Sequence, residues 1–256
     1  GRPGAAVWWV TLQGMLAFML LLSPAGAPLL VAGLRAILHG FFHPDLLSGL
    51  AVVAAFSTGV REATTGHPHA EGFVTAAMIL TVINSGRNLE TRLRRALVRT
   101  AGADIGPGAT AASALRNTLA DDLASALVPI SIAIAALTFL AWMNYSAGAW
   151  WSGMRAAIAV LVIASPSALG LAPSPIASTA RPSMPFRTAS VSERSQARAH
   201  RLMHRNLWLT IAYHLIAIAA AALGQVPPIC AAAAAALWPS IIALNVLRLR
   251  RHQREG

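Results

Sequence analysis

The sequence predicts an all-α protein: a single bundle of about seven transmembrane helices with one further helix in the membrane interface. Three observations predict this class. Apolar stretches of roughly 18–20 residues, the length that crosses a bilayer, recur along the chain. Hydrophobic residues make up 56% of the 256 residues and charged residues only 11%. The basic residues, all of them arginine, stand mostly in short runs between the apolar stretches, so residues 1–256 form one predicted transmembrane domain.

Each apolar stretch defines one predicted helix. The predicted spans are residues 7–24, 45–60, 70–90, 126–144, 155–173, 206–224 and 228–247. Residues 28–42 have an amphipathic pattern, which predicts a helix that lies in the interface. Residues 96–118 and 178–204 are rich in Gly, Pro, Ala and Ser, which predicts two short cytoplasmic loops. Neither reaches the roughly 50 residues of the smallest ordinary folded domain.

The arginines also predict an orientation. With a cytoplasmic C-terminus, seventeen of the twenty arginines fall on the cytoplasmic side, and only Arg2, Arg61 and Arg155 fall outside. Such an excess of arginine in cytoplasmic loops is the positive-inside rule. We therefore expect a multi-pass protein of a bacterial cytoplasmic (plasma) membrane, with the N-terminus outside and the C-terminus in the cytoplasm.

Composition narrows the possible partners and sites. The net charge of +11 is strongly basic, but its distribution over membrane loops argues against nucleic acid as a partner. The only cysteine, Cys230, excludes an internal disulfide and any multi-cysteine metal site. No signal-peptide pattern is visible. The chain starts at Gly1 instead of Met, so the sequence leaves the true N-terminus open.

Six segments, taken in order, resemble the membrane domain of heavy-metal-transporting (type IB) P-type ATPases, the copper pumps especially. They are AGLRAILHGFFHPDLLSGLAV (32–52), EGFVTAAMILTVINSGRNLETRLRR (71–95), LADDLASALVPISIAIAALTFLAW (119–142), AIAVLVIASPSALGLAPSPIA (157–177), RNLWLTIAYHLIAIAAAALG (205–224) and AAAALWPSIIALNVLRLRR (233–251). The resemblance implies a kinked platform helix in the first segment. It also implies that the fourth is the helix that carries a Cys-Pro-Cys metal site in the family.

In this chain Ser165 and Ser167 flank Pro166 where the family has the two cysteines. Serine hydroxyls are hard, neutral and poor ligands for Cu(I), which prefers soft sulfur ligands. A proline inside a membrane helix still breaks the helix and frees backbone carbonyls. The sequence therefore predicts loss of the soft site. Two interpretations stay open, namely a proline kink used for packing and a surviving polar ion site.

Other family positions are only partly kept. The resemblance places Tyr213 and His214 where the copper pumps pair Tyr with Asn, and it matches Glu90 and Asp121 to two acids of the cytoplasmic uptake route. The imidazole of His214 suits a borderline ion such as Zn²⁺. A lone histidine among apolar residues is also a common packing residue, so both roles stay open.

A second candidate position lies in a predicted extracytoplasmic loop. His67, His69, Glu62 and Glu71 fall within residues 62–72, a spacing that could ligate Zn²⁺ or Cu²⁺, and the alternative is a polar proline turn between two helices. A copper or zinc ion is therefore the cofactor that the candidate residues suggest, and no other is predicted.

The resemblance also shows which pump parts are missing. The family phosphorylates an Asp within Asp-Lys-Thr-Gly, and this sequence contains no lysine, no Thr-Gly-Glu and no Gly-Asp-Gly. We therefore expect a degenerate, non-enzymatic pump-like protein, a pseudoenzyme that serves a membrane complex as a structural or accessory subunit, with metal (copper) delivery as one task. The expected partners are the lipid bilayer and other integral membrane subunits.

Alternatives from another class stay open. In these alternatives the chain is a metal-ion transporter, a passive metal pathway, or the membrane half of a split pump whose ATPase domains belong to another chain. A laboratory truncation is a third alternative, which the irregular linker at residues 99–113 disfavours because a designed linker would show a Gly-Ser repeat.

Overall fold

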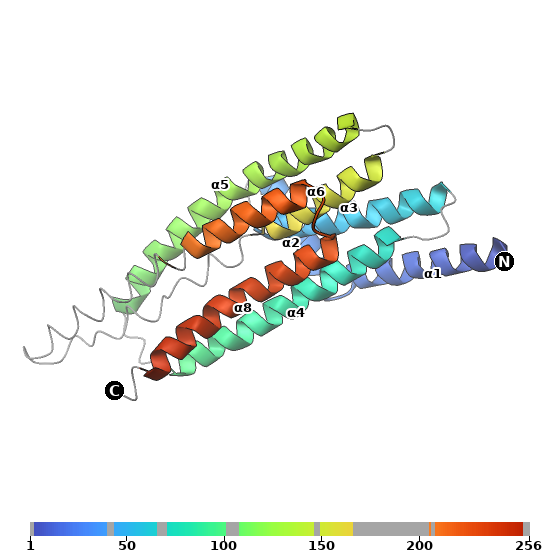
Figure 1. Ribbon diagram of the computed structural model, residues 1–256. Coiled ribbons are helices and arrows are strands. Elements are labelled where there is room, and N and C mark those ends of the chain that lie inside the picture. Colours follow the sequence, from blue (N-terminus) through green and yellow to red (C-terminus); the bar gives the residue numbers. More distant parts are fainter. Residues whose placement is uncertain are drawn as a thin grey trace, which may run out of the picture.

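The computed structural model describes residues 3–39, 44–65, 71–100, 108–145, 149–165, 205 and 208–252. Every regular element in these ranges is an α-helix, so the predicted all-α class is confirmed for them (Figure 1). In chain order the helices are α1 (Pro3–Leu22), α2 (Ala27–His39), α3 (Pro44–Thr64), α4 (Glu71–Thr100), α5 (Gly108–Tyr145), α6 (Trp150–Ile163), the unlabelled helix Trp208–Ala222 and α8 (Pro228–His252).

The helix positions follow the predicted pattern. Each predicted span overlaps one of these helices, and the predicted interfacial segment 28–42 overlaps α2. Between α1 and α2 the chain turns at Ser23–Gly26, and the two apolar parts, Val7–Leu22 and Ala27–Arg35, meet at an angle of 64°. Apolar runs bounded by polar or proline-containing stretches were therefore sufficient to place the elements.

Fewer helical stretches than predicted pass as membrane spans by length and composition among the described residues. Two helical stretches among the described residues, Asp45–Thr64 and Leu127–Tyr145, are long and apolar enough to cross a membrane, and a third results if the bent α1–α2 pair counts as one span. The prediction of about seven spans is thus not confirmed. Helix α6 shows the reason, since its 14 residues extend over about 21 Å, which is less than the roughly 30 Å of a hydrocarbon core.

Two predicted boundaries require correction. The span predicted at 155–173 begins earlier, at Trp150, its helix α6 ends at Ile163, and the predicted residues 166–173 lie outside the described residues. Pro166 explains the early end, because a proline disfavours helical conformation in the residue before it.

The loop predicted at 96–118 is largely helical, since α4 continues to Thr100 and α5 begins at Gly108. Its Ala, Leu and Arg residues are strong helix formers, which outweigh its scattered Gly and Ser. The other predicted loop, 178–204, lies outside the described residues.

Helix α6 forms the centre of the bundle. Its residues from Ala156 to Ile163 are all buried, on every side of the helix. A helix that is apolar all round is typical of a protein core or of a membrane span, and the burial of α6 assigns it to the core. Helices α3, α5 and α8 pack against it, and α4 packs in turn between α3 and α8 (Figure 1).

Small residues allow the close approach of the outer helices. At Gly86 of α4, an added Cβ atom would lie 2.6 Å from the Cβ of Ala236 in α8. At Gly59 of α3, it would lie 2.6 Å from the backbone nitrogen of Phe73 in α4. These two close approaches have the small-residue packing that the Ala- and Gly-rich sequence favours in lipid.

The two ends of the bundle differ in chemistry. Helix α4 and helix α8 both finish in arginine-rich sequence, and their C-terminal ends lie at the same end of the molecule (Figure 1). The opposite end carries exposed aromatic residues, with Trp8 78%, Trp9 62% and Tyr145 84% exposed. Arginine-rich helix ends and exposed aromatic rings near helix ends are both common features of membrane proteins.

Candidate functional site

The end of α6 carries a polar cluster made of four side chains from three segments. Ser165 is the second residue after the last helical residue of α6, Asp45 and Ser48 belong to the start of α3, and Arg87 belongs to α4. Ser48 is only 1% exposed, and its hydroxyl donates a hydrogen bond to the Ser165 hydroxyl over 3.3 Å. Ser165, the first residue of the Ser-Pro-Ser motif, is therefore hydrogen-bonded to a neutral side chain, that of Ser48.

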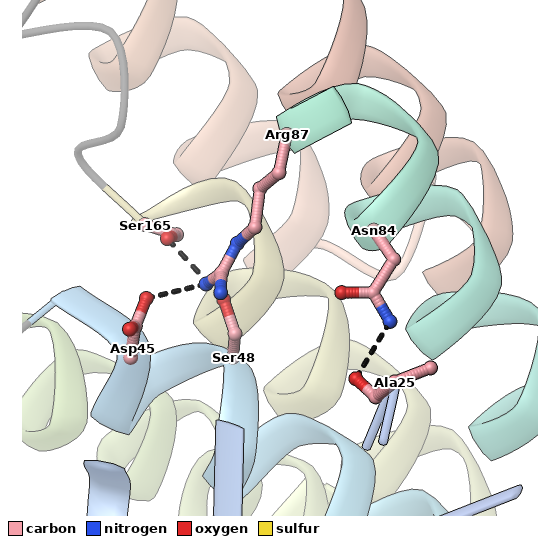
Figure 2. Close-up of polar contacts among 6 residues, drawn as sticks. All are labelled: Ala25, Asp45, Ser48, Asn84, Arg87 and Ser165. Atoms are coloured by element: carbon pink, nitrogen blue, oxygen red, sulfur yellow. Dashed lines mark hydrogen bonds and ion pairs between the residues drawn. The ribbon is translucent and has the colours of Figure 1, made fainter. Parts of the chain in front are cut away.

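An ion pair stands beside these two hydroxyls. The Arg87 guanidinium donates a hydrogen bond to the Asp45 carboxylate. Asp45 and Ser48 are three residues apart and therefore share one face of α3. Figure 2 shows the Arg87 side chain directed toward that face, with Ser165 on the same side. The cluster thus joins α3, α4 and the end of α6 by polar contacts.

The same stretch of α4 also fixes the break between α1 and α2. The side-chain amide of Asn84 donates a hydrogen bond of 2.9 Å to the Ala25 carbonyl (Figure 2). This carbonyl lies in the turn where the chain bends, and a turn carbonyl has no partner within a helix. Because Asn84 and Arg87 lie on one face of α4, one helix surface positions both the bend and the ion pair.

The cluster offers oxygen ligands and a fixed positive charge. Hydroxyls and a carboxylate favour hard ions, and no thiolate is present for a soft one. The guanidinium stays charged at any physiological pH and already holds the carboxylate. A cation at Ser165 would therefore face an adjacent positive charge, so the geometry suits a helix-to-helix lock better than an ion site.

Tyr213 and His214 form a second, separate group with α8. The Tyr213 ring stacks on Trp238, with ring centres 4.3 Å apart and planes inclined by 7°. The Nδ1 of His214 lies 2.8 Å from the Thr210 carbonyl, and the Trp238 indole donates to the Thr210 hydroxyl over 3.3 Å. A carbonyl only accepts, so this bond puts the proton on Nδ1 and leaves Nε2 as the ring's acceptor. Both packing and ligand roles are compatible with that tautomer.

Two buried hydroxyl groups, one on each of these helices, lack a hydrogen-bond partner within the described part of the chain. The Tyr213 hydroxyl and the Ser240 hydroxyl are buried and make no hydrogen bond within the described part of the chain. An unpaired buried hydroxyl costs on the order of 1–3 kcal/mol. These two hydroxyls are therefore less well satisfied than those of Ser48 and Ser165.

The remaining candidates are spread over the molecule. Glu90 is half-buried on α4 and already engaged with a neighbour. Asp121 belongs to α5, but its side chain lies outside the described part, as do Ser167, His67 and His69. Among the described residues, no three His, Cys, Asp or Glu side chains come close enough to hold a metal ion.

Sequence reasoning missed Asp45, Ser48 and Arg87. The Asp-x-x-Ser spacing behind Pro44 was readable as one helix face, because proline often occupies the first position of a helix. Arg87 was counted among the cytoplasmic arginines because it opens the run of six between residues 87 and 116. Only the packing of α3 against α4 shows that it pairs with Asp45.

Two curated proteins share sequence with part of this chain. A copper-exporting P-type ATPase of Staphylococcus haemolyticus (strain JCSC1435) is 54% identical over 55 residues, and one of Staphylococcus saprophyticus subsp. saprophyticus is 51% identical over 55 residues. The match covers 21% of this chain and only 7% of each pump. No family model and no solved structure matches the chain. These similarities support a partial relationship to copper-exporting P-type ATPases and a membrane protein related to metal transport.

Proposed function

We propose that this chain is a pump-derived membrane bundle without catalysis of its own, which serves a membrane complex as a structural or accessory subunit. The observation that supports this most is the ion pair of Arg87 with Asp45 beside Ser165. Where the resembling pumps present thiolates to a soft ion, this chain has hydroxyl groups and a permanent positive charge. Such a site holds helices together and offers no soft ligand to a cation, while the Asp45 carboxylate is already paired with Arg87.

The finer membrane arrangement is part of the same proposal. Seven spans, an extracytoplasmic N-terminus and a location in a bacterial plasma membrane are supported by the seventeen-to-three distribution of arginine and by the separation of arginine-rich and aromatic ends. Shorter helices such as α6 cross only part of the bilayer by themselves, so they require the continuing chain on either side to complete a span.

Phosphorylation of the purified chain tests the non-catalytic part. Because the sequence has no Asp-Lys-Thr-Gly, we expect no ATP hydrolysis and no acid-stable, hydroxylamine-sensitive phosphoprotein. A complete copper pump, assayed in the same detergent, is the positive control. A labelled band on this chain would overturn the proposal.

A second candidate function is supported by the sequence match itself. If the chain is the membrane half of a split pump or a passive metal pathway, the 54% identical stretch and the unpaired Tyr213 and Ser240 hydroxyls would belong to a working ion route. Proteoliposomes that hold the chain alone test the passive pathway, and addition of a soluble ATPase partner tests the split pump. Copper or zinc uptake that Tyr213→Phe abolishes would favour this function over the first.

A further inference from the structure

A pocket near the aromatic end of the bundle is not explained by the proposed function. It has a volume of about 110 Å³, well above the roughly 10–15 Å³ that one water molecule requires. Helix α4 lines it with Glu71 and Thr75, α6 lines it with Trp151 and Arg155, and the segment before α8 adds Pro227. Helix α3 adds Thr58, so four parts of the chain line one space.

The pocket carries two opposite charges that do not neutralise each other. Glu71 and Arg155 line the same space, yet within the described part of the chain they form no ion pair with each other and no hydrogen bond with another side chain. Elsewhere at this end, charged groups do find partners. Arg61 lies 4.0 Å over the Trp150 ring, and the buried Glu62 carboxylate accepts a hydrogen bond from the Gly72 backbone at 2.8 Å. The two pocket charges are thus exceptions.

Two separated charges of opposite sign select a particular ligand. A simple anion would be attracted by Arg155 but repelled by Glu71. A simple cation would be attracted by Glu71 but repelled by Arg155. A zwitterion satisfies both, since a guanidinium binds phosphate oxygens in a fork and a carboxylate accepts hydrogen bonds from a primary ammonium. Thr75 adds a hydroxyl, and Trp151 and Pro227 form apolar walls for the carbon atoms between the two charges.

We propose that this pocket binds a phosphoethanolamine group, with its phosphate on Arg155 and its ammonium on Glu71. The position favours a phospholipid headgroup as the source. Thr75 and Arg155 lie about one helical turn inside the starts of α4 and α6, at the end that carries the exposed tryptophans. Tryptophan marks the depth of lipid headgroups in membrane proteins, and both charged side chains are exposed.

Native mass spectrometry of the delipidated full chain tests the proposal with three lipids. Phosphatidylethanolamine offers both charges, phosphatidylglycerol lacks the ammonium, and phosphatidylcholine replaces it by a bulky group without N–H donors. We expect the wild type to retain phosphatidylethanolamine best. Arg155→Gln should weaken retention of phosphatidylethanolamine by about tenfold. Glu71→Gln should abolish only the preference over phosphatidylglycerol.

Arg92→Gln is the matched control, because it removes an exposed arginine from α4 outside the pocket. Free phosphoethanolamine is the second probe, and binding that requires Glu71 and Arg155 without any lipid preference would assign the pocket to a soluble ligand of the same chemistry. Circular dichroism confirms that each variant is folded. If neither probe depends on Glu71 and Arg155, or if Arg92→Gln has the same effect as Arg155→Gln, the proposal is wrong.

Discussion

The ion pair between Asp45 and Arg87 is the side-chain contact whose loss should be felt most at the end of α6. The Arg87 side chain is 37% exposed and that of Asp45 25%, so the pair is neither fully screened by water nor fully buried. We expect a coupling free energy of about 1 kcal/mol from a double-mutant cycle of Asp45→Asn and Arg87→Gln. Thermal unfolding in detergent measures it. A coupling indistinguishable from zero would show that the pair does not lock the helices.

The neighbouring serines should matter less. The Ser48–Ser165 hydrogen bond is long, at 3.3 Å, and joins two neutral groups. In the variant with Ser165→Ala and Ser167→Ala, the Ser48 hydroxyl can turn to a carbonyl of its own helix, so we expect a loss below about 1 kcal/mol. We also expect no tight Cu(I) in the wild type, measured by competition with a colorimetric chelator. Stoichiometric copper in the wild type that is lost in the double variant would show that the two serines form a copper site.

The sequence predicted chemistry at single residues better than it predicted their neighbours. Replacement of two cysteines by serine already predicted the loss of a soft site. That Ser165 meets Ser48, and that Asp45 pairs with Arg87, depends on how α3, α4 and α6 pack. A family motif can single out residues such as Glu90 and His214. It does not predict which charged side chains of another helix lie next to them.

The approach of α4 to α8 depends on the absence of a side chain at Gly86. An added Cβ would lie 2.6 Å from the Cβ of Ala236 and 2.9 Å from its backbone, closer than atoms in proteins normally approach. We expect Gly86→Ala to lower stability by about 1–3 kcal/mol, as overpacking usually does. Adding Ala236→Gly should restore part of that stability, since it removes the clash between the two side chains but leaves the clash with the α8 backbone. Melting in detergent measures both.

Gly33→Ala is the control for this pair of variants. Its added Cβ would lie 3.7 Å from the backbone and the side chain of Leu46, an ordinary van der Waals distance. Because alanine favours helix more than glycine does, we expect Gly33→Ala to be neutral or stabilising. If Gly33→Ala costs as much as Gly86→Ala, the loss is not specific to the packing of α4 on α8. If Ala236→Gly restores nothing, the two helices do not meet as the structure has them.

Helix positions were predictable because apolar runs and prolines act locally, whereas helix lengths were not. Helix α5 extends over 38 residues, about 57 Å, although its apolar part is only Leu127–Tyr145. Its first half is polar and continues the helix because alanine and leucine favour helix without any need for a bilayer. Hydropathy therefore located the helices but missed their extensions beyond the apolar stretches.

At the scale of the whole molecule, the bundle has one central helix and a large apolar exterior. Helix α6 is enclosed, while α1 and the helix Trp208–Ala222 carry many exposed apolar side chains. On α1, Met15 is 61% and Met19 68% exposed, and on the other helix Leu215 is 68% exposed. In lipid such faces need no cover, but they are also where neighbouring membrane proteins can pack. The accessory role therefore predicts contacts on these faces.

Photo-crosslinking in native membranes tests that association. A crosslinking amino acid at Met15 or Leu215 should capture other integral membrane subunits, because both side chains point away from the core. The same amino acid at Ile158, which is 2% exposed, is the matched control and should capture none. A split pump would instead give crosslinks from the arginines at 194–205 to a soluble ATPase, since a basic cytoplasmic strip suits docking of a soluble domain. A chain that is extracted as a lone monomer in mild detergent, with no partner from either surface, would contradict both forms of association, because a motorless bundle would then have no partner to serve.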